Sequence, residues 1–172
     1  MYDPTVYENL KVAFENTLYD LDNLDGTIHI TNRMDRMEMS VMSREFAIQF
    51  VLAEYREISA EIALEASLQD LAAEILDLPG ENPACTLRLR FVMEMENVET
   101  QCDQIAQLLP QIWESSVTPS QTLSYVYGQE RMLFTNTIEV RFQRKINEDQ
   151  MEDVPEVVDH VIRTLIGLKD LQ

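Results

Sequence analysis

The side chains of this sequence that could take part in catalysis or ligand binding are two histidines and a few charged residues. Nucleophilic catalysis requires a base beside a serine, threonine or cysteine, and His29 and His160 are the only histidines. His160 lies four residues before Thr164, the spacing of neighbours on one helix face, where such pairs are common and usually inert. His29 is therefore the better candidate, with partners among the charged residues that share its face of a sheet.

The segment Thr86 to Asn97, TLRLRFVMEMEN, predicts a strand that is buried on one face. Its apolar residues require a core, and its other face carries Arg88, Arg90, Glu94 and Glu96. Residues 136–142 alternate in the same way and place Glu139 and Arg141 on their polar face. Strand parity thus predicts a mixed-charge face, and the candidate binding residues on it are His29, Arg88, Arg90, Glu94, Glu139 and Arg141.

This polar face has two interpretations. Its residues form a site for a partner or ligand, or they form cross-strand ion pairs on a solvated sheet, each contributing well under about 1 kcal/mol. Ion pairs of the second kind are the commoner arrangement. Met34, Met42 and Val92 also have outward parity, which is more typical of a covered or dimerised surface, whereas Met37 and Met39 are expected to point inward.

The sequence predicts no catalytic residue, no metal ligands and no cofactor. The four glycines are scattered and form no phosphate-binding loop. Cys85 and Cys102 lack metal-binding spacing and are expected to be small buried residues. The acidic run 20–26 does not match the ligand spacing of an EF-hand calcium loop.

The net charge of −18 disfavours binding to nucleic acid or to anionic membranes. Nine of the thirteen basic residues lie in the stretches that we expect to form strands, which together carry a net charge of +2, whereas the rest of the chain carries −20. The polar sheet face is therefore the one surface where an acidic partner would not be repelled. The expected partner is a second copy of the chain, giving a homodimer, or another protein.

The length of 172 residues favours a single domain over residues 1–172. No apolar run is long enough to span a bilayer. The first ten residues carry two acidic side chains where a signal peptide would carry lysines and an apolar run. We therefore expect a cytoplasmic protein.

Helical spacing and capping residues predict four helices. The first begins at Asp3-Pro4 and ends at Asp25-Gly26, the second runs from Ser59 to about Asp77, the third follows Asn97, and the last begins near Asp153 with Pro155 in its first turn. The expected strands are 27–36, 38–53, 85–96 and 130–146, with a further strand at 122–128 that forms a hairpin through Gly128 and a loop over SSVTPSQ before it.

The order helix, strand, strand, helix occurs twice in this interpretation, over about 4–77 and 98–170, and REFAIQF at 44–50 matches NTIEVRF at 136–142. Two such pseudo-repeats suggest an internal α-β-β-α duplication. With or without it, the predicted fold is an α+β two-layer sandwich. It has a mostly antiparallel sheet of about five or six strands and four helices mainly on one face.

The favoured function is that of a non-catalytic interaction or accessory protein that uses the polar sheet face for self-association or partner binding. The alternative is a small-molecule enzyme or sensor with a site around His29 and the Arg/Glu sheet face. An enzyme or sensor needs a concave pocket that gathers His29 with the arginines, whereas an interaction protein needs a flat patch of partner size. A nucleic-acid binder ranks third, because it would need unpaired and clustered basic residues.

Overall fold

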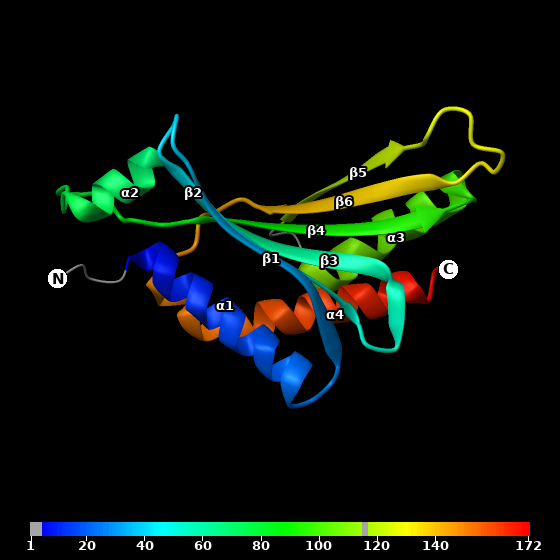
Figure 1. Ribbon diagram of the computed structural model, residues 1–172, viewed down its shortest axis with the longest axis horizontal. Helices are drawn as coiled ribbons and strands as arrows, with labels where there is room; N and C mark the ends of the chain where they lie inside the picture. Colours follow the sequence, from blue (N-terminus) through cyan, green and yellow to red (C-terminus); the bar gives the residue numbers. More distant parts are fainter. Residues whose placement is uncertain (1–4, 115–116) are drawn as a thin grey trace.

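The computed structural model of this chain describes residues 5–114 and 117–172, and its core is a six-stranded sheet in the order β1-β2-β3-β4-β6-β5 (Figure 1). The elements, in chain order, are α1 (Val6–Asn23), β1 (Ile28–Glu38), β2 (Ser43–Leu52), β3 (Tyr55–Ala66), α2 (Leu68–Ile75), β4 (Thr86–Met95), α3 (Val98–Trp113), β5 (Val117–Ser124), β6 (Phe134–Phe142), the 3₁₀ helix η2 (Glu148–Asp153) and α4 (Val154–Lys169).

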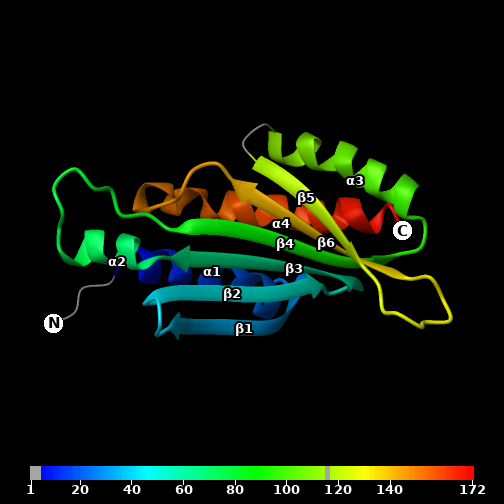
Figure 2. The same cartoon turned by 90° about the horizontal axis from the view of Figure 1, so that it is seen from above.

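The predicted α+β fold is confirmed. Every pair of neighbouring strands is antiparallel, and the four helices pack against the sheet. Helices α1, α3 and α4 lie on one side of the sheet, and α2 lies at one end of it (Figures 1 and 2). One broad face of the sheet is therefore left without a covering helix.

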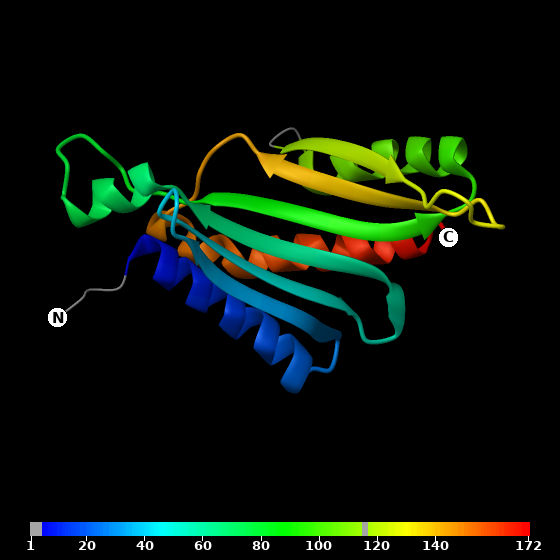
Figure 3. The same cartoon turned by 45° about the horizontal axis from the view of Figure 1, so that its top comes forward.

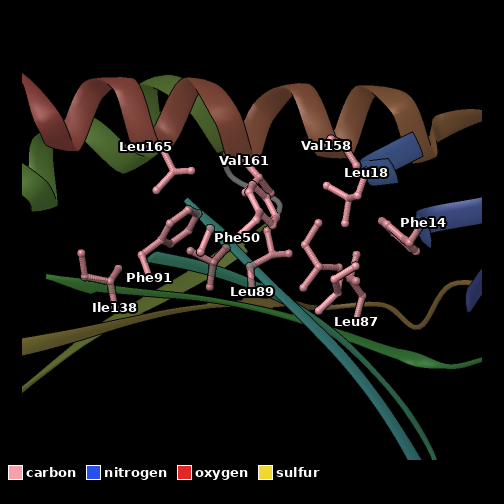
Figure 4. Close-up of a cluster of buried hydrophobic side chains, with 14 of the residues drawn as sticks. Phe14, Leu18, Phe50, Leu87, Leu89, Phe91, Ile138, Val158, Val161 and Leu165 are labelled. Atoms are coloured by element: carbon pink, nitrogen blue, oxygen red, sulfur yellow. The ribbon is translucent and has the colours of Figure 1, made fainter. Parts of the chain in front are cut away.

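Strand alternation builds the core between the sheet and the helices. In β4, Leu87, Leu89 and Phe91 are buried while the residues between them are less so. Leu89 is flanked by Ile62 of β3 and Val140 of β6, so the register extends one apolar row across three strands. Figure 4 shows Leu89 and its neighbours in β4 facing side chains of α1 and α4, among them Phe14, Leu18, Val158, Val161 and Leu165.

The ends of the helices follow the capping chemistry of the sequence. The predicted start at Asp3-Pro4 lies outside the described residues, and within them Thr5 is the N-cap of α1, its hydroxyl accepting a hydrogen bond from the Glu8 amide. Asp153 and Pro155 begin α4 as predicted. Asn97 occupies the N-cap position of α3 but makes no side-chain capping bond.

The prediction of one helix from Ser59 to Asp77 is wrong, because residues 59–66 belong to β3 and only Leu68–Ile75 is helical. A spacing of four residues suits one face of a strand as well as one face of a helix, so Glu57, Glu61 and Glu65 were ambiguous. The residues between them decide the outcome, since Ile58, Ala60, Ile62, Leu64 and Ala66 alternate as a buried strand face.

Two further boundaries differ from the prediction. Residues 39–42 form the turn between β1 and β2. Met37, near the end of edge strand β1, and Met39, in the turn, are 43% and 71% exposed and are not part of the core. The predicted loop SSVTPSQ contains the start of β5, while residues 115 and 116 lie outside the described part of the chain. Pro119 is tolerated because β5 is an edge strand.

The order helix, strand, strand, helix is found in the second half, as α3, β5, β6 and α4. The first half has three strands between α1 and α2. The internal duplication stays a prediction.

We predict that Leu18→Ala lowers the free energy of unfolding by about 2–5 kcal/mol, because Leu18 is fully buried between α1 and the sheet. Val12→Ala is the matched control, since Val12 lies on the exposed side of the same helix at 47% exposure. Urea unfolding followed by circular dichroism measures both changes. Equal effects of the two substitutions would contradict the observed orientation of α1.

Candidate functional site

The face of the sheet opposite the helices, which we call the open face, carries a network of four arginines and four glutamates from five strands. Strand register places Arg90 directly between Glu61 and Glu139. It also places Arg88 directly opposite Arg141. The eight members of this open-face network are Arg36, Glu45, Glu61, Glu65, Arg88, Arg90, Glu139 and Arg141.

Arg88 is the centre of one half of the network. Its Nη1 lies 2.9 Å from Glu65 Oε1, and its Nη2 lies 3.3 Å from Glu45 Oε1. Glu45 in turn accepts from Arg36 Nη2 at 2.6 Å. These bonds connect β1, β2, β3 and β4 across the face.

Arg90 organises the other half. Its Nη2 donates to Glu139 Oε1 at 2.9 Å, and its Nη1 lies 3.7 Å from Glu61 Oε1. Glu139 also accepts from Arg141 at 3.2 Å, and Glu61 accepts from Gln49 Nε2 at 2.7 Å. The like charges of Arg88 and Arg141 are thus offset by a carboxylate beside each of them.

Several side chains of the network are largely buried, and one of them has a shifted pKa. The side chain of Glu61 is only 11% exposed and that of Arg88 only 19%, although no helix covers them. The hydrogen bond from Arg90 is the main reason why the pKa of Glu139 lies below its ordinary value, with Arg141 adding to the effect against a smaller contribution from burial. A carboxylate held in this way is a fixed anion at neutral pH and a poor proton donor or acceptor.

The structure brings together four of the six predicted candidate residues, namely Arg88, Arg90, Glu139 and Arg141. His29 is exposed on edge strand β1, opposite Val51, and three strands from β4. At about 4.8 Å between strands this separates it from the arginines by roughly 14 Å. Glu94 shares the open face but lies opposite Thr135, near the end of β4 and away from the ion pairs.

Four members of the network were missed. Glu61 and Glu65 were assigned to a helix, and the alternation of Ile58 to Ala66 is the signal that could have placed them on a strand. Arg36 has the same parity as Met34, which was expected to point outward, but it was not named as a candidate. A register shift between Ile30 and Asn32 reverses the parity of Ile28 and Ile30, so Arg36 lies on the open face. Glu45 has outward parity in a predicted strand, and its position could have been found.

The remaining reactive side chains form no catalytic arrangement. His160 Nδ1 donates to the carbonyl oxygen of Glu156, while the Thr164 hydroxyl donates to the carbonyl of His160 and accepts from Trp113 Nε1. The histidine ring therefore does not activate Thr164. Burial raises the pKa of the Cys85 thiol to about 12 and also raises that of Cys102, which disfavours thiolate formation at neutral pH.

A second charged cluster lies on the helix side, where α1 meets β1 and β2. Lys11 Nζ is 2.8 Å from both Asp35 and Glu8, and Arg44 also contacts these two carboxylates. The Tyr7 hydroxyl donates to Asp35 at 3.1 Å, and the Arg44 guanidinium lies over the Tyr7 ring. Tyr7 and Lys11 are 1% and 9% exposed. This cluster fixes the first half of α1 to the sheet.

Within residues 5–114 and 117–172, no group of three or more His, Cys, Asp or Glu side chains is placed to hold a metal ion. None of the helices in these ranges combines the length and apolar character needed to cross a bilayer.

Comparison of the chain with models of protein families, with curated proteins and with solved structures gave no match.

We predict that the Arg90–Glu139 pair contributes a coupling free energy of only about 0.5–1 kcal/mol to folding, because Arg90 is one-third exposed and solvent screens the pair. A double-mutant cycle with Arg90→Ala and Glu139→Ala, measured by urea unfolding, gives this quantity. The coupling should fall when salt is raised to about 1 M. A coupling above about 2 kcal/mol that is insensitive to salt would contradict the prediction.

We further predict that the cluster around Asp35 makes the protein sensitive to acid. Burial acts to raise the pKa of Asp35, but the hydrogen bond and charge of Lys11, the Tyr7 hydroxyl and Arg44 outweigh it, so the pKa lies below the ordinary 3.8. The pKa of Glu8 is also lowered, against burial, by Lys11 and Arg44. Because both values are depressed in the folded state, their stabilisation is complete above the ordinary pKa values and is lost as pH falls through the folded-state ones.

Asp35→Asn should therefore lower stability at pH 7 and flatten its decline between about pH 4.5 and pH 2. Urea unfolding at a series of pH values measures this. Asp103→Asn, at an exposed position on α3, is the control and should leave the pH profile unchanged. An equally steep acid decline in Asp35→Asn would show that the cluster is not its source.

Proposed function

We propose that this protein is a non-catalytic interaction protein that self-associates through its open face. The observation that carries the proposal is the charge balance of the ion-pair network on that face. Its network contains four arginines and four glutamates, whose formal charges cancel, on a chain with a net charge of −18. Two copies that meet through this network place no excess of like charge in direct contact, although the acidic remainder of each copy still repels the other.

The arrangement of charges on the face also suits a two-fold symmetric contact. The facing pair Arg88 and Arg141 forms a positive area. Glu45 and Glu65 lie on one side of it, and Glu61 and Glu139, with Arg90 between them, lie on the other. In an isologous interface the same patch meets itself, so a pattern that alternates in sign can place the positive area of one copy on a negative area of the other. Alternating charges would fix the register of such a dimer.

Two arginines at the margins of the network have unused donors. Arg36 and Arg141 are 63% and 68% exposed, and each has one carboxylate partner among the ion pairs of the described residues. A guanidinium has five N–H donors, so both can bind a further acceptor on another molecule. Arginine is also enriched among the residues that dominate interface energies. In such a dimer, the ion pairs of Arg88 and Arg90 would hold the face rigid, and Arg36 and Arg141 would donate hydrogen bonds to the other molecule.

The geometry does not favour the alternative of a small-molecule enzyme or sensor. That function requires His29 and the arginines to meet in a pocket, whereas His29 lies on the edge strand, three strands away from β4. A nucleic-acid interface would need unpaired basic side chains. Each of the four arginines of the network instead contacts a glutamate.

We predict that the wild-type protein is a dimer at about 50 µM and that Arg141→Glu weakens the dimer at least about tenfold, because the substitution reverses a charge at the interface. The matched control is Arg163→Glu on α4, which makes the same change in net charge at a side chain of 50% exposure with one acidic neighbour. The control should leave the dimer intact. Sedimentation equilibrium measures both.

A wild-type monomer at this concentration would refute self-association. Equal weakening by the two substitutions would show that net charge, and not the open face, governs association. Circular dichroism of each variant verifies that the fold is retained.

A further inference from the structure

One end of the molecule exposes a group of large apolar side chains that the proposed open-face contact does not use. The turn between β1 and β2 lies beside α2 in all three views of the ribbon (Figures 1, 2 and 3). Together they expose six side chains, each between 44% and 71% accessible, which we call the end patch: Met39, Val41, Met42, Leu68, Ile75 and Leu76. Large apolar side chains exposed in this number at one end of a domain indicate an interaction surface.

The orientation of α2 explains why this patch is exposed. A surface helix normally buries its apolar side and exposes its charged side. In α2, two acidic residues are bonded to the body of the protein: Asp70 accepts from Lys145 Nζ at 2.7 Å, and Glu74 accepts from the Val6 amide at 2.7 Å. Leu68 and Ile75, at the two ends of the helix, are left facing solvent. The helix is held in place by polar contacts while much of its apolar surface lacks a cover.

The electrostatic surroundings of the patch are acidic. The chain has no lysine or arginine between Glu57 and Leu87. The basic residues nearest to this end, Arg36, Arg44 and Lys145, are each bound to a carboxylate. Glu38, Asp77 and Glu81 are exposed around the turn and α2. The end patch is therefore an apolar surface with a negative rim.

We propose that the end patch binds a cationic amphipathic helix of another protein. Apolar residues spaced i, i+3 or i+4 and i+7 on such a helix would cover Leu68, Ile75 and Leu76. Its lysines and arginines would face the acidic rim. The methionines of the turn suit this role because their unbranched side chains adapt to the shape of a bound helix. A second copy of this acidic chain is disfavoured at this end, because the two negative rims would repel each other.

The test uses three synthetic peptides of about 18 residues, long enough for five helical turns. The first contains leucine and lysine in an amphipathic helical pattern, the second has the same composition in a scrambled order, and the third replaces lysine by glutamate. Isothermal titration calorimetry measures their affinities. Methyl NMR of the methionines locates the contact. The first peptide should bind at least about tenfold more tightly than the other two and should shift the signals of Met39 and Met42.

Leu76→Ser should weaken binding of the first peptide about tenfold, because it removes an apolar contact. The matched control is Leu24→Ser, since Leu24 and Leu76 are both exposed leucines at helix C-caps. The control should bind like the wild type. Equal binding of the scrambled peptide, equal effects of the two substitutions, or unshifted Met39 and Met42 signals would each overturn the proposal. A Leu76→Ser variant that changes the sedimentation of the protein alone would instead assign the patch to self-association and would also overturn it.

Discussion

The constraint on which the rest of this structure depends is that helices cover only one face of a six-stranded sheet. Strand alternation sends half of the side chains to the other face, where no element supplies partners. The arginines and glutamates of that face therefore bind one another across strands. Their long side chains also shield smaller residues, because Ala63, directly opposite Arg88, is 0% exposed on a face that no helix covers. The side chains of the open-face network thus cover this face of the sheet, as the helices cover the other face.

The same constraint explains which parts of the fold could be predicted from the sequence. Alternation in 86–95 and 136–142 was clear, because each of these strands separates a helix-covered face from an uncovered one. In β3 the signal was ambiguous, because glutamates spaced by four residues and alanines with high helix propensity also fit a helix. Burial beside β2 and β4 overrode that local propensity. A sheet covered by helices on one face could be predicted from the sequence. The position of its strand β3 could not, because it depends on contacts between residues distant in sequence.

Residues of the candidate site could be predicted only where the alternation of side chains along one strand is enough to assign them to a face. Arg88, Arg90, Glu139 and Arg141 follow from alternation within two strands, and their mutual contacts follow from the pairing of β4 with β6. His29 could not be excluded in advance, because parity gives the face of a residue but not its distance across the sheet. The register shift after Ile30 reverses the parity of the rest of β1, and this irregularity has no simple local signature. Strand order and bulges, rather than residue types, therefore limited the prediction.

Charge segregation gives the two proposed surfaces opposite electrostatic behaviour. Self-association through a neutral face is opposed by the −18 charge on the rest of each copy, so added salt, which screens that repulsion, should favour it. Binding of a cationic helix to the acidic end is instead driven partly by attraction, and the same salt weakens it. The response of each proposed contact to salt therefore distinguishes one from the other.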